Sequence, residues 1–76
     1  MSTKEEKDQI RILTDKAKHE LSVTEQTKAI DALASFGKNS VPSLKEIAEF
    51  PVSGQVREHA IQTLKKLRQK YPENDD

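Results

Sequence analysis

This chain of 76 residues has no cysteine and no tryptophan, and it contains only two glycines, three prolines, two phenylalanines and one tyrosine. The absence of cysteine excludes disulfide frameworks, thiolate zinc sites and cysteine nucleophiles. A chain of this size buries only about 60% of the surface that it exposes when unfolded. We therefore expect one domain with a thin core and a net stability of roughly 3 to 5 kcal/mol.

The chain also lacks an excess of charge of either sign, since 13 Lys and Arg residues are balanced by 13 Asp and Glu residues. Nucleic-acid-binding domains usually carry a basic excess, so this balance makes nucleic acid an improbable partner. No run approaches the roughly 18 apolar residues of a membrane span, and the polar segment Met1 to Asp8 lacks the apolar stretch of a secretory signal. A cytoplasmic protein that does not enter membranes is the expected class.

Apolar residues recur at steps of three and four along the whole chain, which is the period of amphipathic helices, and no segment alternates with period two. Helices are predicted at about residues 3–20, 23–36, 41–50 and 55–71. The residues predicted to face the core are Ile10, Leu13, Ala17, Leu21, Ala29, Ile30, Leu33, Phe36, Val41, Leu44, Ile47, Ala48, Val56, Ala60, Ile61, Leu64, Leu67 and Tyr71.

The few glycines and prolines mark the predicted helix ends. Gly37 is placed to cap the second helix, Pro42 to start the third, and Pro72 to end the fourth. Pro51 and Gly54 bracket a short loop. Two pairs have the spacing of a capping box, namely Thr3 with Glu6 and Ser22 with Glu25.

The sequence repeats with a period of 31 residues. This shift produces six identities, which pair Leu13 with Leu44, Ala17 with Ala48, Ser22 with Ser53, Ala29 with Ala60, Ile30 with Ile61 and Leu33 with Leu64. Charged positions mostly do not match. A repeat conserved in its apolar positions is typical of helical units that must stack to bury their apolar faces.

These residues resemble the HEAT-like repeat family. The resemblance rests on V-R-E-H-A-I-Q-T-L at 56–64, T-K-A-I-D-A-L at 27–33, and the inter-helix turn A-L-A-S-F-G-K-N-S-V-P-S-L at 32–44. The first copy departs from the pattern, with Glu25 and Gln26 where Val56 and Arg57 stand in the second.

The resemblance implies an all-α domain over residues 1–72, built as a right-handed stack of four antiparallel helices. After Pro72 we expect an acidic disordered tail at 73–76. The second and third helices would form the complete repeat, with the first helix belonging to an incomplete one and the fourth capping the array. The alternative is a simple four-helix bundle in which the period is a by-product of two similar hairpins.

In HEAT-like arrays the second helix of each pair lines the concave surface that binds partners. By this resemblance, the exposed positions of the first and third helices are the candidate partner surface: Arg11, Ile12, Asp15, Lys18, Lys45, Glu46 and Glu49, with Thr14 and Ser43 beside them. The implied function is a non-catalytic protein–protein interaction or scaffold module, whose partner is another protein. No catalytic residue, metal or cofactor is expected.

Other chemistry-bearing residues have simpler interpretations. His19 and His59 are interpreted as separate surface residues, and the serines as caps and turn residues. The basic run Lys65, Lys66, Arg68 and Lys70 suits the negative end of the fourth helix. It also supports an alternative function, a nucleic-acid-associated helical repeat that uses this basic end, or a contact for an acidic partner.

Overall fold

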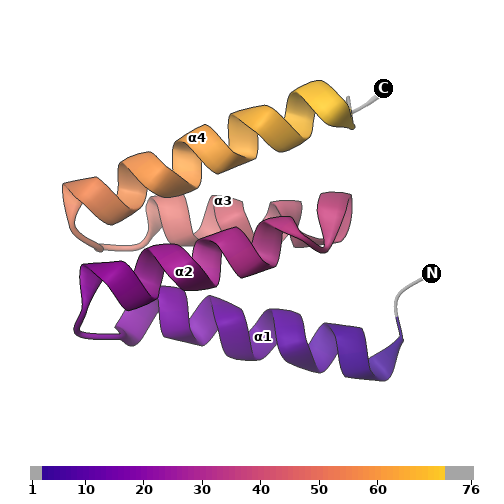
Figure 1. Ribbon diagram of the computed structural model, residues 1–76, viewed down its shortest axis with the longest axis horizontal. Helices are drawn as coiled ribbons and strands as arrows, with labels where there is room; N and C mark the ends of the chain where they lie inside the picture. The colour runs from indigo at the N-terminus through magenta and orange to yellow at the C-terminus, as the bar shows by residue number, and fades with distance from the viewer. Residues whose placement is uncertain (1–2, 72–76) are drawn as a thin grey trace.

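The computed structural model describes residues 3–71, which form four α-helices and one short 3-10 helix (Figure 1). The elements are α1 (Lys4–His19), α2 (Val23–Ala34), η1 (Gly37–Ser40), α3 (Val41–Glu49) and α4 (Gly54–Lys70). The prediction of an all-helical chain with four helices is confirmed, and no strand occurs within the described range. Pro72 and the predicted acidic tail at 73–76 lie outside it. None of the helices within residues 3–71 is both long enough and apolar enough to cross a bilayer.

Hydroxyl side chains start three of the helices by accepting a backbone N–H three residues further on. Thr3 accepts from Glu6 at 3.0 Å at the start of α1. Ser22 does the same for α2 at 3.4 Å, and Ser53 for α4 at 3.3 Å. Ser22 and Ser53 are 31 residues apart in the sequence, so the predicted recurrence of a helix start is confirmed. Helix α3 begins instead with a proline in its first turn, as predicted for Pro42.

The connection from α2 to α3 turns on a left-handed glycine. Helix α2 ends at Ala34, two residues before the predicted end, and Gly37 then has a φ of +67° at the start of η1. The Ser40 hydroxyl donates to the Gly37 carbonyl at 2.8 Å, which closes the turn. The other glycine differs from its prediction, because Gly54 is the first residue of α4 and not part of the preceding loop.

Replacing Gly37 with alanine should therefore destabilise the fold by about 1 to 2 kcal/mol, the cost of a left-handed conformation for a residue with a Cβ. Space is not the obstacle, since the added Cβ would lie 3.5 Å from the Tyr71 hydroxyl, an ordinary contact. Gly54→Ala is the matched control, because its Cβ would meet nothing within 4 Å and alanine is the better helix former. Urea denaturation of both variants measures the difference, and equal stabilities would contradict this explanation.

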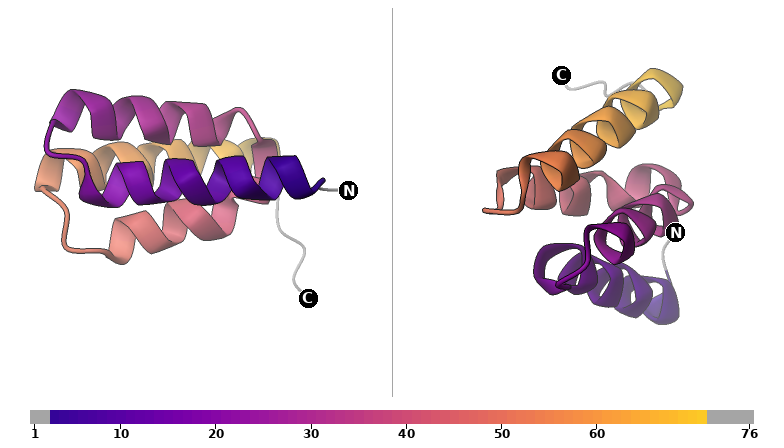
Figure 2. Two further views of the ribbon diagram at one scale, coloured as in Figure 1. Left: turned by 90° about the horizontal axis from the view of Figure 1, so that it is seen from below. Right: turned by 60° about the vertical axis from the view of Figure 1, so that its left-hand side comes forward.

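The four helices form two antiparallel hairpins, α1 with α2 and α3 with α4, which pack against each other (Figure 2). Across this contact α2 lies along α4 and α1 lies along α3, and each of these pairs runs in the same direction. Helices α2 and α3 touch only at a few points, although the sequence analysis grouped them as the complete repeat. In a bundle with simple up-and-down order, α2 would instead pack along α3.

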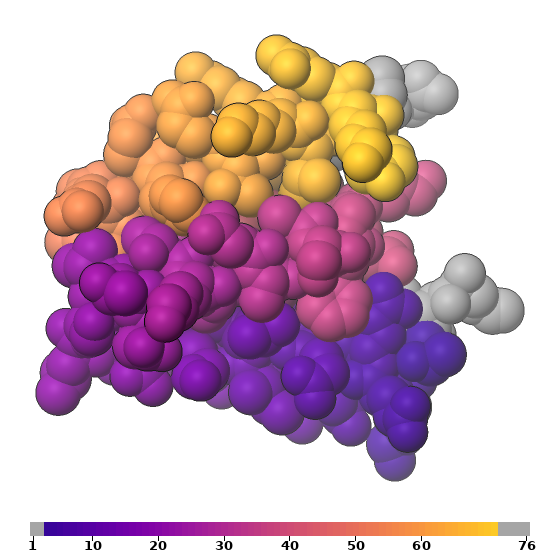
Figure 3. Space-filling view, in the orientation of Figure 1, coloured from indigo at the N-terminus to yellow at the C-terminus, as the bar shows by residue number. Residues whose placement is uncertain are grey.

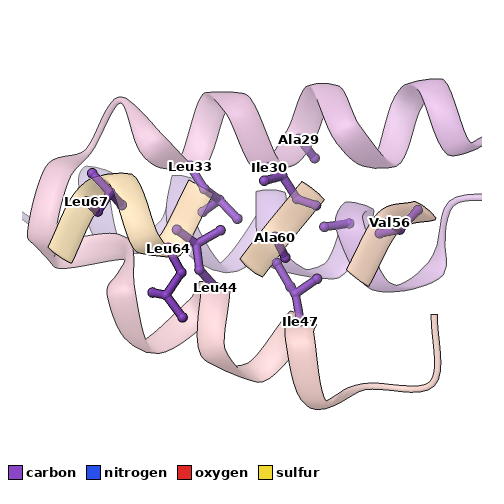
Figure 4. Close-up of a cluster of buried hydrophobic side chains, with 10 residues drawn as sticks. Ala29, Ile30, Leu33, Leu44, Ile47, Val56, Ala60, Leu64 and Leu67 are labelled. Atoms are coloured by element: carbon purple, nitrogen blue, oxygen red, sulfur yellow. The ribbon is translucent and has the colours of Figure 1, made fainter. Parts of the chain in front are cut away.

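Apolar side chains from all four helices meet in one core between the hairpins (Figure 4). Its buried members are Ala17, Ala29, Ile30, Leu33, Leu44, Ile47, Val56, Ala60, Leu64 and Leu67, all of them predicted. The prediction is wrong for Tyr71, which is 38% exposed after the end of α4, and for Leu21, whose relative exposure is 101%. The physical reason is that α1 ends at His19, so Leu21 lies in the following loop and no longer follows the helical period.

A polar side chain near the start of the second helix also holds each hairpin together. In the first hairpin, Gln26 Nε2 donates to the buried Ala17 carbonyl at 2.9 Å. In the second, Arg57 Nη2 donates to the Phe50 carbonyl at 3.3 Å. Gln26 and Arg57 each stand four residues after the capping serine. The departure of the first copy from the V-R pattern therefore preserves the same kind of bond.

Candidate partner-binding groove

A groove of about 250 Å³ runs between α1 and α3, the two helices seen side by side from below in Figure 2. It is open to solvent and is lined by Lys7, Ile10, Arg11, Thr14, Asp15, Lys18, Ser43 and Glu46. The groove lies where side chains of these two neighbouring helices border the same gap.

Four of the seven predicted surface residues meet in this groove, namely Arg11, Asp15, Lys18 and Glu46. The other three, Ile12, Lys45 and Glu49, are exposed but do not line it. Ile12 and Lys45 each stand next to a groove residue in the sequence, so their side chains point toward another face of the helix. Glu49 lies about one turn beyond Glu46, at the end of α3. The groove also contains two residues that the sequence analysis did not single out as site residues, Lys7 and Ile10.

Lys18 lies at the edge of the groove, where contacts within the protein cover most of its side chain. Its side chain is only 13% exposed, and its ammonium group pairs with the Glu46 carboxylate across the gap between α1 and α3. The same nitrogen lies 4.9 Å from the centroid of the Phe50 ring, a cation–π distance. Lys18 therefore fixes α3 against α1, whereas Glu46, at 55% exposure, still presents part of its carboxylate to solvent.

The charges along the groove are arranged by sign. Lys7 and Arg11, one helical turn apart on α1, make the half nearer the start of that helix positive. Asp15 and Glu46 make the other half negative, with Lys18 partly neutralising Glu46. Arg11 also contacts Asp8 at 3.5 Å, but both side chains are well exposed, so this pair is weak. The groove can thus accept a segment that carries charges of both signs in a fixed order.

Ile10 and Thr14 add an uncharged strip between these charges. The Thr14 hydroxyl donates to the Ile10 carbonyl at 2.6 Å, which uses its proton within the helix. A partner's apolar or aliphatic side chain can therefore rest on this strip while its charged groups meet the rims.

The two histidines have contacts that their sequence positions did not indicate. The His19 ring packs edge-on against Phe50, with centroids 5.2 Å apart. His59 Nε2 lies 2.8 Å from Asp31 Oδ1, which links α4 to α2 on the opposite layer from the groove. Within residues 3–71, no three His, Asp or Glu side chains are grouped so that they could share a metal ion.

Comparisons of this chain with protein-family models, with curated proteins and with solved structures return no match.

Proposed function

We propose that this domain is a non-catalytic binding module of the cytoplasm, which holds a segment of another protein in the groove between α1 and α3. The observation that carries the proposal is the convergence of Arg11, Asp15 and Glu46 from two helices on one open groove. Charges of opposite sign in a fixed order steer a partner and set its register, and they exclude partners whose charges are in the wrong order.

We further propose that the helices stack as in a HEAT-like array, with α1 and α3 forming one layer and α2 and α4 the other. Three features support this: the side-by-side packing of α1 with α3 and of α2 with α4, the capping serines one period apart, and the burial of both Leu33 and Leu64. In the family that the sequence resembles, the helices equivalent to α1 and α3 bind partners. The groove lies between these two helices.

The groove fits a short peptide segment better than a small ligand. It is open along its length, and its charged residues are spread over three turns of α1, from Lys7 to Lys18. The complementary segment places an acidic side chain near Lys7 and Arg11 and a basic one near Asp15 and Glu46.

A pull-down from extract of the source cells tests this function. The groove variant carries Arg11→Glu with Asp15→Lys, which reverses the order of charges and leaves the net charge unchanged. We expect the variant to lose its partner by about tenfold or more, since placing like charges together in an interface costs well over the 1.4 kcal/mol of a tenfold change. Quantitative mass spectrometry of the captured proteins gives the measurement.

The matched control exchanges Glu25→Lys with Lys28→Glu, two exposed residues of α2 that form a weak i,i+3 pair at 3.9 Å. The control should capture the same partner as the unmodified chain, and circular dichroism should show that both variants are folded. If both variants retain every captured protein, or if both lose the same ones, the groove is not the binding site.

A further inference from the structure

The last two turns of α4 carry a concentrated positive charge, which we call the basic end of α4 and define as Lys65, Lys66, Arg68 and Lys70. All four residues are exposed, and the end of α4 forms the top of the face seen in Figure 3. Residues 65–70 contain four of the 13 basic residues and no acidic one, whereas residues 3–64 contain nine basic and ten acidic residues. The neutral total is therefore the sum of a charge of +4 at residues 65–70, a charge of −1 at residues 3–64, and a charge of −3 from Glu73, Asp75 and Asp76, which follow in the sequence.

Helix stability does not account for this cluster. The helix dipole favours cations in the last turn, which covers Arg68 and Lys70 but not the earlier Lys65 and Lys66. Lys65 and Arg68 are three residues apart, and Lys66 and Lys70 are four apart, so they are like-charged neighbours that destabilise a helix. Elsewhere the chain places an acid four residues after a lysine, as in Lys4 with Asp8, Lys16 with Glu20 and Lys45 with Glu49.

The basic surface is also short. Its four residues span about 7.5 Å along the helix axis at 1.5 Å per residue. Toward the start of α4 the surface charge becomes negative. Asp31 contacts His59 there, and the exposed Glu58 is the residue before His59. Positions 58 and 59 lie about 9 to 11 Å from Lys65 along the helix axis. An extended polyanion such as duplex DNA, which needs a long basic surface, would meet these carboxylates.

We propose that the basic end of α4 is a second contact surface, which binds a short acidic segment of a partner protein. It lies on the α2–α4 layer, apart from the groove between α1 and α3. The cluster's charge, its exposure and its short length match a run of a few Asp or Glu residues. Binding such a run also relieves the repulsion between the like-charged neighbours.

Fluorescence anisotropy of the full chain tests this surface, with a labelled oligoglutamate peptide, an oligoglutamine peptide, and single-stranded and duplex oligonucleotides of matched charge. Titrations are made at about 50 and 200 mM salt, the range over which charge-driven binding weakens strongly. We expect oligoglutamate to bind, oligoglutamine not to bind, and the oligonucleotides to bind no more tightly than oligoglutamate. At physiological salt the oligonucleotides should bind with a Kd above about 100 μM, at the weak limit of non-specific binding.

Two variants with the same change in net charge separate a local surface from a general charge effect. The α4 variant combines Lys65→Gln, Lys66→Gln and Arg68→Gln. It should weaken oligoglutamate binding about tenfold or more. The control variant combines Lys4→Gln, Lys16→Gln and Lys28→Gln, which are exposed residues of α1 and α2. It should leave oligoglutamate binding nearly unchanged. The groove variant Arg11→Glu with Asp15→Lys should bind oligoglutamate normally, so a failure of the groove proposal is distinguishable from a failure of this one.

Three results overturn the proposal. The first is that the unmodified chain does not bind oligoglutamate at low salt. The second is that the α4 variant and the control variant lose oligoglutamate affinity equally. The third is tighter binding of duplex than of oligoglutamate, with a log–log salt slope near −3 to −4 that is lost in the α4 variant. That slope corresponds to about four neutralised phosphates and would assign this surface to nucleic acid.

Discussion

Replacing Leu33 with alanine should lower the free energy of unfolding by about 2 to 5 kcal/mol. Leu33 is completely buried in α2, a helix that packs against α1, α4 and η1. The core has ten buried members, three of them alanines, so little neighbouring side-chain volume can move into the cavity. For a domain whose expected stability is roughly 3 to 5 kcal/mol, the loss is large enough to leave the variant mostly unfolded at physiological temperature.

Chemical denaturation followed by far-ultraviolet circular dichroism measures this loss. Leu64→Ala should cost a similar amount, because Leu64 is buried at the equivalent position one period later. Ile12→Ala is the control, since this side chain is 48% exposed and surface changes usually stay within about 0.5 kcal/mol. A Leu33 variant that melts within a degree or two of the unmodified chain would refute the core assigned to α2.

The second large effect is expected at Gln26, where replacement by leucine should destabilise the fold by about 1 to 3 kcal/mol. The last carbonyls of a helix have no partner within the helix, and Ala17 lies two residues before the end of α1. Gln26 supplies the missing donor to the Ala17 carbonyl, and Ala17 is fully buried, so no water replaces the bond when the amide is removed.

Gln26→Arg gives this prediction a sharper test, because arginine occupies the equivalent place in the second hairpin. Arg57 donates there to the Phe50 carbonyl. An arginine at position 26 should therefore recover part of the stability that Gln26→Leu loses. Equal stability of the leucine variant and the unmodified chain, by thermal and urea denaturation, would mean that this hydrogen bond contributes nothing.

Local chemistry made most of the fold predictable. The helical period selected all ten buried core residues, and the caps at Thr3 and Ser22 were visible as spacings. Helix ends were less predictable, because they depend on where the backbone leaves the helical conformation. The early end of α1 places Leu21 in solvent, and the early end of α2 puts two residues between the helix and Gly37.

The site was only partly predictable because it depends on which helices lie side by side. Arg11 and Asp15 were recognised as exposed, but the burial of Lys18 depends on Glu46 and Phe50, which come from α3 and the loop after it. The repeat does contain a usable signal. Two contacts join residues that are 28 positions apart, namely Lys18 with Glu46 and Asp31 with His59. This separation is shorter than the 31-residue period by about one helical turn. Neighbouring parallel helices thus bring residues of that separation together.

The placement of the chain ends determines how this domain responds to tension. Helix α1 begins and α4 ends at the same end of the molecule, on opposite sides of the packed hairpins (Figure 1). A force that pulls Lys4 away from Lys70 therefore acts across the helix axes, and it separates each outer helix from its neighbours one turn at a time. Such unzipping does not load all the contacts of a helix at once, so we expect the domain to unfold at a lower force when pulled at these two residues than when pulled along its helix axes.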